Sequence, residues 1–196
     1  MANEQLQHPD VDAGAVYAPP ARWFHWVTVA FILVLPVVGQ IMVDDDNPFK
    51  LSDAFRAQMT SMHRTFGFIL LWTIVARLFY RARNGAPADE PSLQSWEKTA
   101  SHAVHWVLYA LLIAVPFSGW FASSMYGERG IIFGFNLPQI SWIDQDLADK
   151  IFVWHGRGAW LIVVLAAAHM AAALQHHFIK HDGVLRRMWP GLTKRD

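Results

Sequence analysis

The sequence predicts an all-α integral membrane protein built as a bundle of four transmembrane helices. Hydrophobic residues make up 54% of the 196-residue chain and charged residues only 16%, which is poor in charge for a soluble protein of this size. Four apolar segments, each long enough to cross a hydrocarbon core of about 30 Å, are separated by polar connectors. The spans are predicted at about 23–43, 62–80, 102–125 and 152–177. A soluble bundle is the weaker alternative, because it would need four consecutive over-long apolar helices.

Two of the spans contain a proline. The first, WFHWVTVAFILVLPVVGQIMV, contains Pro36, and the third, HAVHWVLYALLIAVPFSGWFASSM, contains Pro116. Helices in lipid tolerate proline where neighbouring helices satisfy the carbonyls that it frees. The second span is MHRTFGFILLWTIVARLFY, and the fourth leads to the stretch AAALQHH. Tryptophans near the span ends match the aromatic belt of membrane proteins; these are Trp23, Trp26, Trp106, Trp120 and Trp154.

The flanking segments are polar and short. Residues 1–21 form an arm with neither a basic region nor a small-residue cleavage site, so a surface arm is predicted rather than a signal peptide. Residues 22–190 form a single transmembrane domain, and residues 191–196 form a tail. The connectors are a cytoplasmic loop at 84–91, NGAPADEP, and a longer outer loop at 127–150.

Lysine and arginine are biased toward one side of the predicted membrane. Ten of the 16 fall on the side that holds both termini and the loop between spans two and three. The opposite side carries the other six, near a group of aspartates that includes Asp44, Asp45 and Asp46. Because positive charge favours the cytoplasm, both termini are predicted to be cytoplasmic.

The composition also excludes several classes of function. The chain has no cysteine, which rules out disulfides, thiolate metal sites, cysteine nucleophiles and covalent haem attachment. Its formal net charge is zero, and no lysine or arginine cluster is large enough to indicate nucleic-acid binding. Its ten histidines and ten tryptophans are the unusual counts.

Histidines occur at two depths of the predicted bundle. His155 and His169 lie 14 positions apart in the last span, which separates them by about 21 Å along a helix and leaves them within about 40° of one face. The same spacing relates positions in the other spans. An inner layer is therefore predicted near the cytoplasmic side, and an outer layer near the opposite side. The inner layer comprises His25, Arg77, His105 and His169, and the outer layer comprises His63, His155, Gly39 and Gly119.

The two layers favour a flat macrocycle bound between helices. Glycine allows a porphyrin to approach the backbone, and arginine pairs well with a propionate carboxylate. A single membrane histidine can simply bond a neighbouring carbonyl, but ionisable residues in a span are functional candidates. Zinc is the main chemical rival. It usually takes three or four clustered ligands, often with an acid, and no predicted span carries Asp or Glu in its apolar interior. Haem with two axial histidines fits better.

The chain resembles the bacterial cytochrome b561 family over nearly all of its length, from Trp23 to Pro190. The matching stretches are FHW, MH, SHAVHWVLYALLIAVP, WH and HMAAALQHHFIKHDGVLRRMWP. The resemblance implies a four-helix bundle in the bacterial inner membrane with two non-covalent b-type haems. It implies that His25 and His169 hold the cytoplasmic-side haem and that His63 and His155 hold the outer one. His102 and His105 are then interpreted as haem-edge or quinone-side groups.

Transmembrane electron transfer is the function that this resemblance implies. The membrane quinone pool, with ubiquinone, is the expected redox partner, and superoxide oxidation at the outer face is a further activity found among relatives. One rival reading is the cytochrome subunit of a membrane dehydrogenase or hydrogenase. A second, from another class, is a metal or proton transporter that uses histidines as relays. The sequence leaves the oligomeric state and the direction of electron flow open.

The end of the last span supplies the candidate quinone site. His176 is seven residues beyond His169, which places it about 10 Å further toward the cytoplasm and within about 20° of the same face. A histidine there can donate a hydrogen bond and release a proton near neutral pH. His176 is the first candidate and His102 the second; His177, turned about 100° away, is expected to face lipid headgroups.

Overall fold

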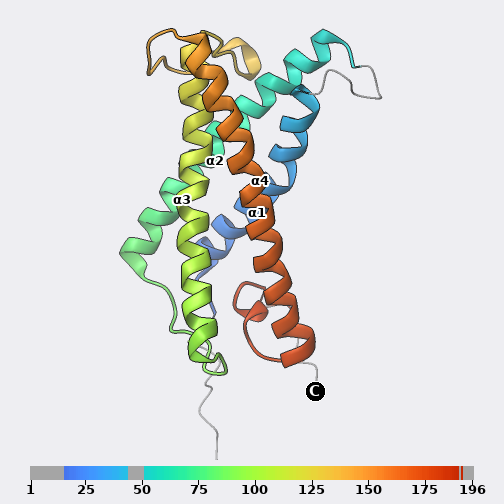
Figure 1. The fold of residues 1–196 in the computed structure, drawn as a ribbon. Helices are drawn as coiled ribbons and strands as arrows, with labels where there is room; N and C mark the ends of the chain where they lie inside the picture. The colour runs from blue at the N-terminus through green and yellow to red at the C-terminus, as the bar shows by residue number, and fades with distance from the viewer. Residues whose placement is uncertain (1–15, 44–50, 190, 192–196) are drawn as a thin grey trace, which may run out of the picture.

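Four long helices form the molecule, and they are the four predicted membrane spans (Figure 1). The computed structural model describes residues 16–43, 51–189 and 191. The elements are α1 (Pro19–Val43), α2 (Asp53–Asn84), α3 (Ser95–Tyr126), η1 (Ile132–Gly134), α4 (Gln145–Gln175), η2 (His176–Lys180) and η3 (Leu185–Arg187). All four long helices are apolar and long enough to cross a bilayer. The predicted all-α transmembrane bundle is therefore confirmed.

Three of the helices begin at a polar cap. The Ser52 hydroxyl accepts a hydrogen bond from the Phe55 amide before α2, and the Asp144 carboxylate accepts one from the Leu147 amide before α4. Gln94 and Glu97 form a reciprocal capping box before α3. These caps satisfy amides that a helix N-terminus leaves without a partner.

Glycines end two of the helices. Gly85 after α2 and Gly127 after α3 have φ angles of 72° and 89°, in the region that a residue without Cβ enters at no steric cost. The helices extend beyond the predicted spans because these caps and stops lie in the polar flanks, outside the apolar windows that define the spans. In contrast, α4 ends at Gln175, and a π-turn follows where an α-helix was predicted to continue to residue 177.

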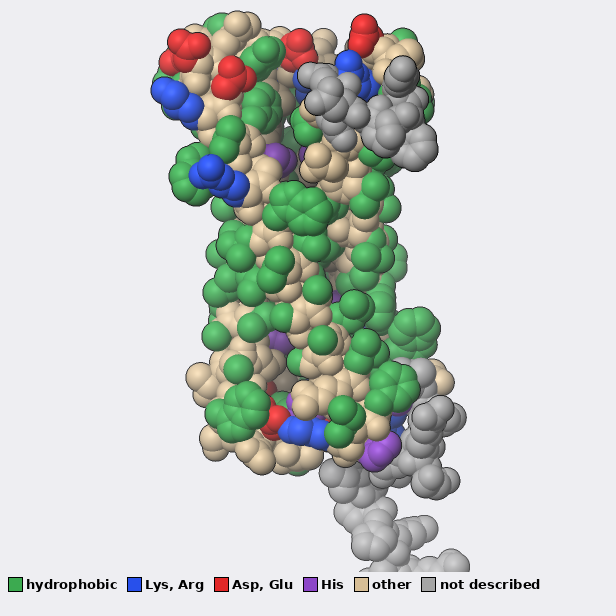
Figure 2. Space-filling view, turned by 45° about the vertical axis from the view of Figure 1, so that its right-hand side comes forward, with side chains coloured by type: hydrophobic (Ala, Val, Ile, Leu, Met, Phe, Trp, Pro, Cys, Tyr) green, Lys and Arg blue, Asp and Glu red, His purple; other side chains and the backbone are tan. Residues whose placement is uncertain are grey.

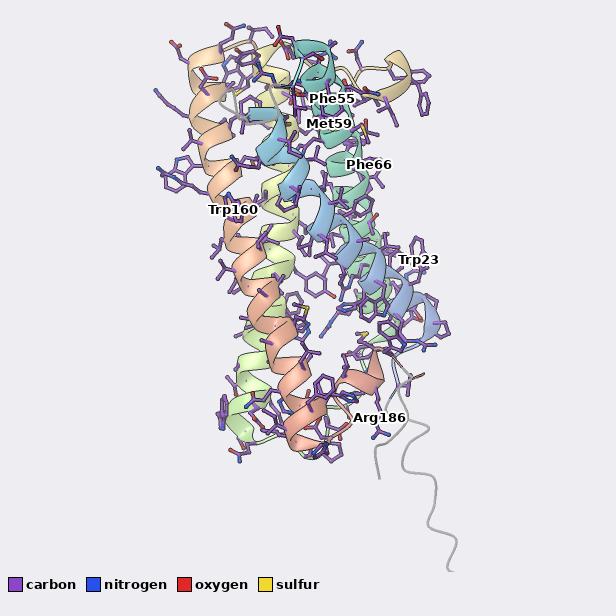
Figure 3. All side chains as sticks on the ribbon, turned by 90° about the vertical axis from the view of Figure 1, so that its right-hand side faces the viewer. Trp23, Phe55, Met59, Phe66, Trp160 and Arg186 are labelled. Atoms are coloured by element: carbon purple, nitrogen blue, oxygen red, sulfur yellow. The ribbon has the colours of Figure 1, made fainter. Side chains whose placement is uncertain are left out.

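The bundle consists of two helix pairs, α1 with α2 and α3 with α4. An apolar core between the helices is formed by the buried residues Leu35, Leu70, Ile74, Tyr109, Leu112 and Ile162. The outer surface is also apolar: hydrophobic side chains cover the middle of the face in Figure 2, and charged side chains lie toward its two ends. Trp23 on α1 and Trp160 on α4 are more than half exposed on that outer surface (Figure 3). An apolar surface between charged ends is what a lipid-embedded bundle requires.

Both described ends of the chain lie at the same end of the bundle. The Tyr17 amide donates to the Arg187 carbonyl at 3.2 Å, and the Trp26 indole donates to the Met188 carbonyl at 3.2 Å. Arg186 lies at that end too, where α4 finishes (Figure 3). The predicted aspartate group Asp44, Asp45 and Asp46, together with most of the N-terminal arm and the C-terminal tail, falls outside the described residues.

Candidate functional site

The outer layer brings together one histidine from α2 and one from α4. The ring centroids of His63 and His155 are 5.9 Å apart, with an angle of 78° between the ring planes. His155 Nδ1 lies 2.9 Å from the Val115 carbonyl oxygen and 3.5 Å from Ser118 Oγ. Because a carbonyl oxygen only accepts, Nδ1 carries the hydrogen and the lone pair of Nε2 stays free.

His63 differs from His155 in its hydrogen bonding. Its Nδ1 is buried and has no hydrogen-bond partner among the described residues. A buried polar atom without a partner costs free energy, and such atoms call for an explanation.

Gly39 and Gly119 make room for the two outer imidazoles. A Cβ added to Gly39 would lie 3.2 Å from His63 Cε1, and one added to Gly119 would lie 2.8 Å from His155 Cε1. Both values are below ordinary van der Waals separation between carbons. These glycines were predicted to let a porphyrin approach the backbone, which stays a prediction. The structure adds that each glycine lies close to the histidine of the adjacent helix.

A repeated motif that the sequence predictions did not include contains both of these glycines. Pro36 and Gly39 occur in the stretch PVVG, and Pro116 and Gly119 occur in PFSG. In each case the glycine on the odd-numbered helix of a pair contacts the histidine of the even-numbered helix. The signal was present as Pro-x-x-Gly at equivalent places in spans one and three.

The inner layer brings together three histidines and an arginine. His25 on α1 and His169 on α4 have ring centroids 6.4 Å apart, with an interplanar angle of 67°. His105 on α3 lies closer, 5.0 Å from His169, and its Nδ1 donates to the Ser101 carbonyl at 2.6 Å. Arg77 Nη2 is 3.5 Å from His25 Nδ1, at the outer limit of a hydrogen bond. Each of the four residues predicted for the inner layer therefore lies close to at least one of the other three.

A small basic cleft opens beside the inner layer. Its walls come from α1, α2, α3 and the segments next to them, and they include Tyr17, Arg77, Arg81, His105 and Tyr109. The Arg77 guanidinium lies 5.2 Å from the centre of the Tyr109 ring. Neither Arg77 nor Arg81 forms an ion pair with a carboxylate among the described residues. The cleft therefore offers two positive charges to an anionic group.

The two candidate quinone-side histidines have different surroundings. His176 is buried, and its Nδ1 lies 2.5 Å from Asp182 Oδ2. His102 is exposed and faces the loop before α3, where its Nε2 lies 2.9 Å from Asp89 Oδ1. The hydrogen bond from His102 lowers the pKa of Asp89 below its usual value. The predicted neighbour His177 is half-buried, with its ring against Phe178.

Comparison with known proteins agrees with this architecture. Residues 16–191 match the family model described as prokaryotic cytochrome b561. "Cytochrome b561 homolog 2" of Escherichia coli K12 is 30% identical over 84% of this chain and 86% of its own length. "Probable superoxide oxidase CybB" of Yersinia pestis is 29% identical over 70% of this chain and 78% of its own length.

A more distant relative is named as a subunit of an enzyme complex. The "Probable Ni/Fe-hydrogenase B-type cytochrome subunit" of Azotobacter chroococcum is 24% identical over 90% of this chain and 86% of its own length. The family match covers most of the chain, from the end of the N-terminal arm to beyond the last helix. The chain therefore belongs to the prokaryotic cytochrome b561 family, and it is a bacterial membrane b-type cytochrome.

Proposed function

We propose that this cytochrome holds two non-covalent b haems, one in each histidine layer, and carries electrons across the bacterial inner membrane to or from the quinone pool. The observation that carries this is the occurrence of one facing histidine pair at each of two depths, His63 with His155 and His25 with His169. The positive-inside bias of the sequence supports placing both termini, and the inner pair, on the cytoplasmic side.

In both histidine pairs, the distance between the two ring centroids fits a pair of imidazoles that would hold one metal between them. A metal–imidazole bond of about 2.0–2.1 Å and a ring radius of about 1.1 Å put the centroids of two opposed ligand rings about 6.3 Å apart. The two pairs measure 5.9 and 6.4 Å, whereas His105 and His169 are only 5.0 Å apart. The distances therefore favour His25 over His105 as the partner of His169.

The polar atoms around each pair also fit the haem. A bound metal would give the buried Nδ1 of His63 the partner that it lacks, and the Val115 carbonyl holds His155 in the tautomer with Nε2 free. Arg77 and Arg81 would receive the propionate carboxylates at the inner site. A haem held by these histidines would supply one-electron transfer.

Quinone exchange is assigned to the cytoplasmic end. His176 would supply a proton there, since histidine changes charge near neutral pH, and His102 is the second candidate. The test is His176→Phe with both haems spectroscopically intact, while the quinone-dependent oxidation of the haems is timed. Slower oxidation than in the wild type supports the assignment, and unchanged kinetics move the site toward His102.

The haem content of the purified protein tests the proposed binding of two haems. Pyridine haemochrome analysis of the purified chain should give two b haems per polypeptide, and acid acetone should extract both because no cysteine anchors them. One haem per chain at full occupancy would mean that one histidine pair is structural. A colourless protein would contradict haem binding altogether and return the metal or proton transporter to consideration.

Two more specific roles have support from named relatives. The hydrogenase subunit of Azotobacter chroococcum favours a cytochrome subunit of a larger complex, which co-purification of a second polypeptide would show. The Yersinia pestis relative favours superoxide as the electron donor at the outer face. Reduction of the outer haem by a superoxide-generating system, abolished by superoxide dismutase, would support that role.

A further inference from the structure

The cytoplasmic end of the bundle holds a buried ionic cluster that the proposed haem sites do not use. Its members are Glu97 from α3, His176 and Lys180 from the π-turn η2, and Asp182 from the turn that follows. The side chains of Glu97, His176 and Asp182 are each exposed by 10% or less. We name these four residues the cytoplasmic cluster. Figure 2 shows acidic, basic and histidine side chains gathered at the lower end of the molecule.

The backbone after α4 is shaped to form this cluster. The α-helix gives way to a π-turn over His176–Lys180, and His181 follows with φ of 56°. The chain then reverses, so that the Asp182 amide donates to the His176 carbonyl at 3.2 Å. Single π-turns in helices frequently occur at functional sites, and a non-glycine residue in the left-handed region is uncommon.

His176 lies between two carboxylates. Its Nδ1 is 2.5 Å from Asp182 Oδ2, and its Nε2 is 3.9 Å from Glu97 Oε1. Lys180 Nζ donates to the same Glu97 oxygen. Glu90, in the loop before α3, lies one step further out, against Gly183.

The cytoplasmic cluster has a net negative charge that one added proton would neutralise. With His176 neutral, two carboxylates face one ammonium group, so the cluster has a net charge of −1. Buried charge of one sign is costly unless it is balanced, and a proton on His176 would balance it. The path to water is short, because Lys180 is one-third exposed and the exposed Ser92 donates to Asp182 at 3.4 Å.

We propose that the cytoplasmic cluster is a proton-loading site, with His176 as the acceptor, whose affinity for a proton from the cytoplasmic side rises when an electron reaches the inner haem. This builds on the electron-transfer function proposed above. Reduction of a quinone consumes two electrons and two protons and yields a quinol. Two electrons would pass from the inner haem to the quinone in succession, and after each one a proton would pass from His176 to a quinone oxygen.

Electrostatic coupling between the two sites has the required size. His176 is seven residues from His169, about 10 Å along the helix. At that distance, and with an effective dielectric constant of about 20, one added electron raises the proton affinity of His176 roughly tenfold. The coupling should therefore appear in the redox behaviour of the inner haem without any quinone present.

The test measures the midpoint potentials of both haems from about pH 5 to about pH 9, the range in which histidine titrates. A tenfold coupling lowers the inner potential by about 59 mV in total as pH rises, and the outer potential serves as the internal reference. His176→Gln should abolish the drop, and Asp182→Asn should shift it to lower pH because a neutral amide favours the imidazolium less. His177→Gln, altered in the same turn, is the matched control and should keep the drop.

Two results would overturn the inference while leaving the haem assignment intact. One is a wild-type inner potential that does not change with pH. The other is a wild-type drop that survives in His176→Gln. In every variant the absorption spectrum and haem content are measured first, so that loss of a haem, which bears on the electron-transfer function, is separated from loss of proton coupling.

Discussion

Replacement of Arg77 by leucine tests the electrostatics of the proposed inner haem site. Arg77 Nη2 lies 3.5 Å from His25 Nδ1, and no carboxylate among the described residues pairs with this arginine. A reduced haem carries one more electron than an oxidised one. A nearby positive charge therefore stabilises the reduced form and raises its midpoint potential.

The size of the effect follows from the distance. A metal held by the far nitrogen of the His25 ring would lie about 4 Å beyond Nδ1, so the guanidinium would be about 7–8 Å from it. At an effective dielectric constant of about 20, a unit charge at that distance contributes about 2 kcal/mol. This corresponds to about 90 mV for one electron. Arg77→Leu should lower the inner potential by about that amount.

The assay is an equilibrium redox titration in lipid nanodiscs, followed by the reduced-haem absorbance. Arg77→Lys retains the charge and should stay close to the wild-type potential. The outer haem, about 21 Å further along α4, should change by about a quarter to a third of the inner shift. An unchanged or raised inner potential in Arg77→Leu, or equal shifts in the leucine and lysine variants, would refute the electrostatic reasoning.

Three further outcomes follow from the two histidine layers. Replacing His155 with alanine should remove the outer haem and leave the inner one, and His169→Ala should do the reverse, as read from haem content and the split of the reduced spectrum. His105→Ala should retain both haems, because its 5.0 Å spacing from His169 is too short for opposed ligands; loss of the inner haem in that variant would make His105 the ligand. Gly119→Ala should lower outer-haem occupancy by more than about half, since the added Cβ would lie 2.8 Å from His155 Cε1 and ordinary carbon contacts begin at about 3.5 Å. Gly67→Ala, whose added Cβ meets nothing within 4 Å, is the matched control and should bind both haems as the wild type does.

The regular part of this molecule was predictable because a helix converts sequence spacing into position. The 14-residue interval between His155 and His169 sets their separation on a straight helix, and the apolar runs set the number of spans. The structure accordingly places His25 near His169 and His63 near His155. Their roles as haem ligands stay predictions.

Contacts between distant parts of the chain could not be read in the same way. Glu97 and Lys180 are 83 positions apart, and no local pattern indicates that they pair. The turn that brings Asp182 under His176 depends on a π-turn and a left-handed residue, which helix periodicity does not predict. The ring contacts of Gly39 and Gly119 depend on how closely neighbouring helices pack, which is also a tertiary property.

Helix α4 contributes a histidine to both layers, and this has a consequence for the speed of electron tunnelling. Tunnelling slows steeply with distance, so a useful relay must keep its two centres at a fixed separation. Residues 145–175 contain no proline, whereas α1 has Pro36 in its interior and α3 has Pro116. The separation is therefore set by 14 residues of one uninterrupted helix. Bending of α1 or α3 in a fluctuating bilayer can tilt the imidazole rings that these helices carry, but it leaves the 14-residue spacing on α4, and with it the length of the proposed electron path, unchanged.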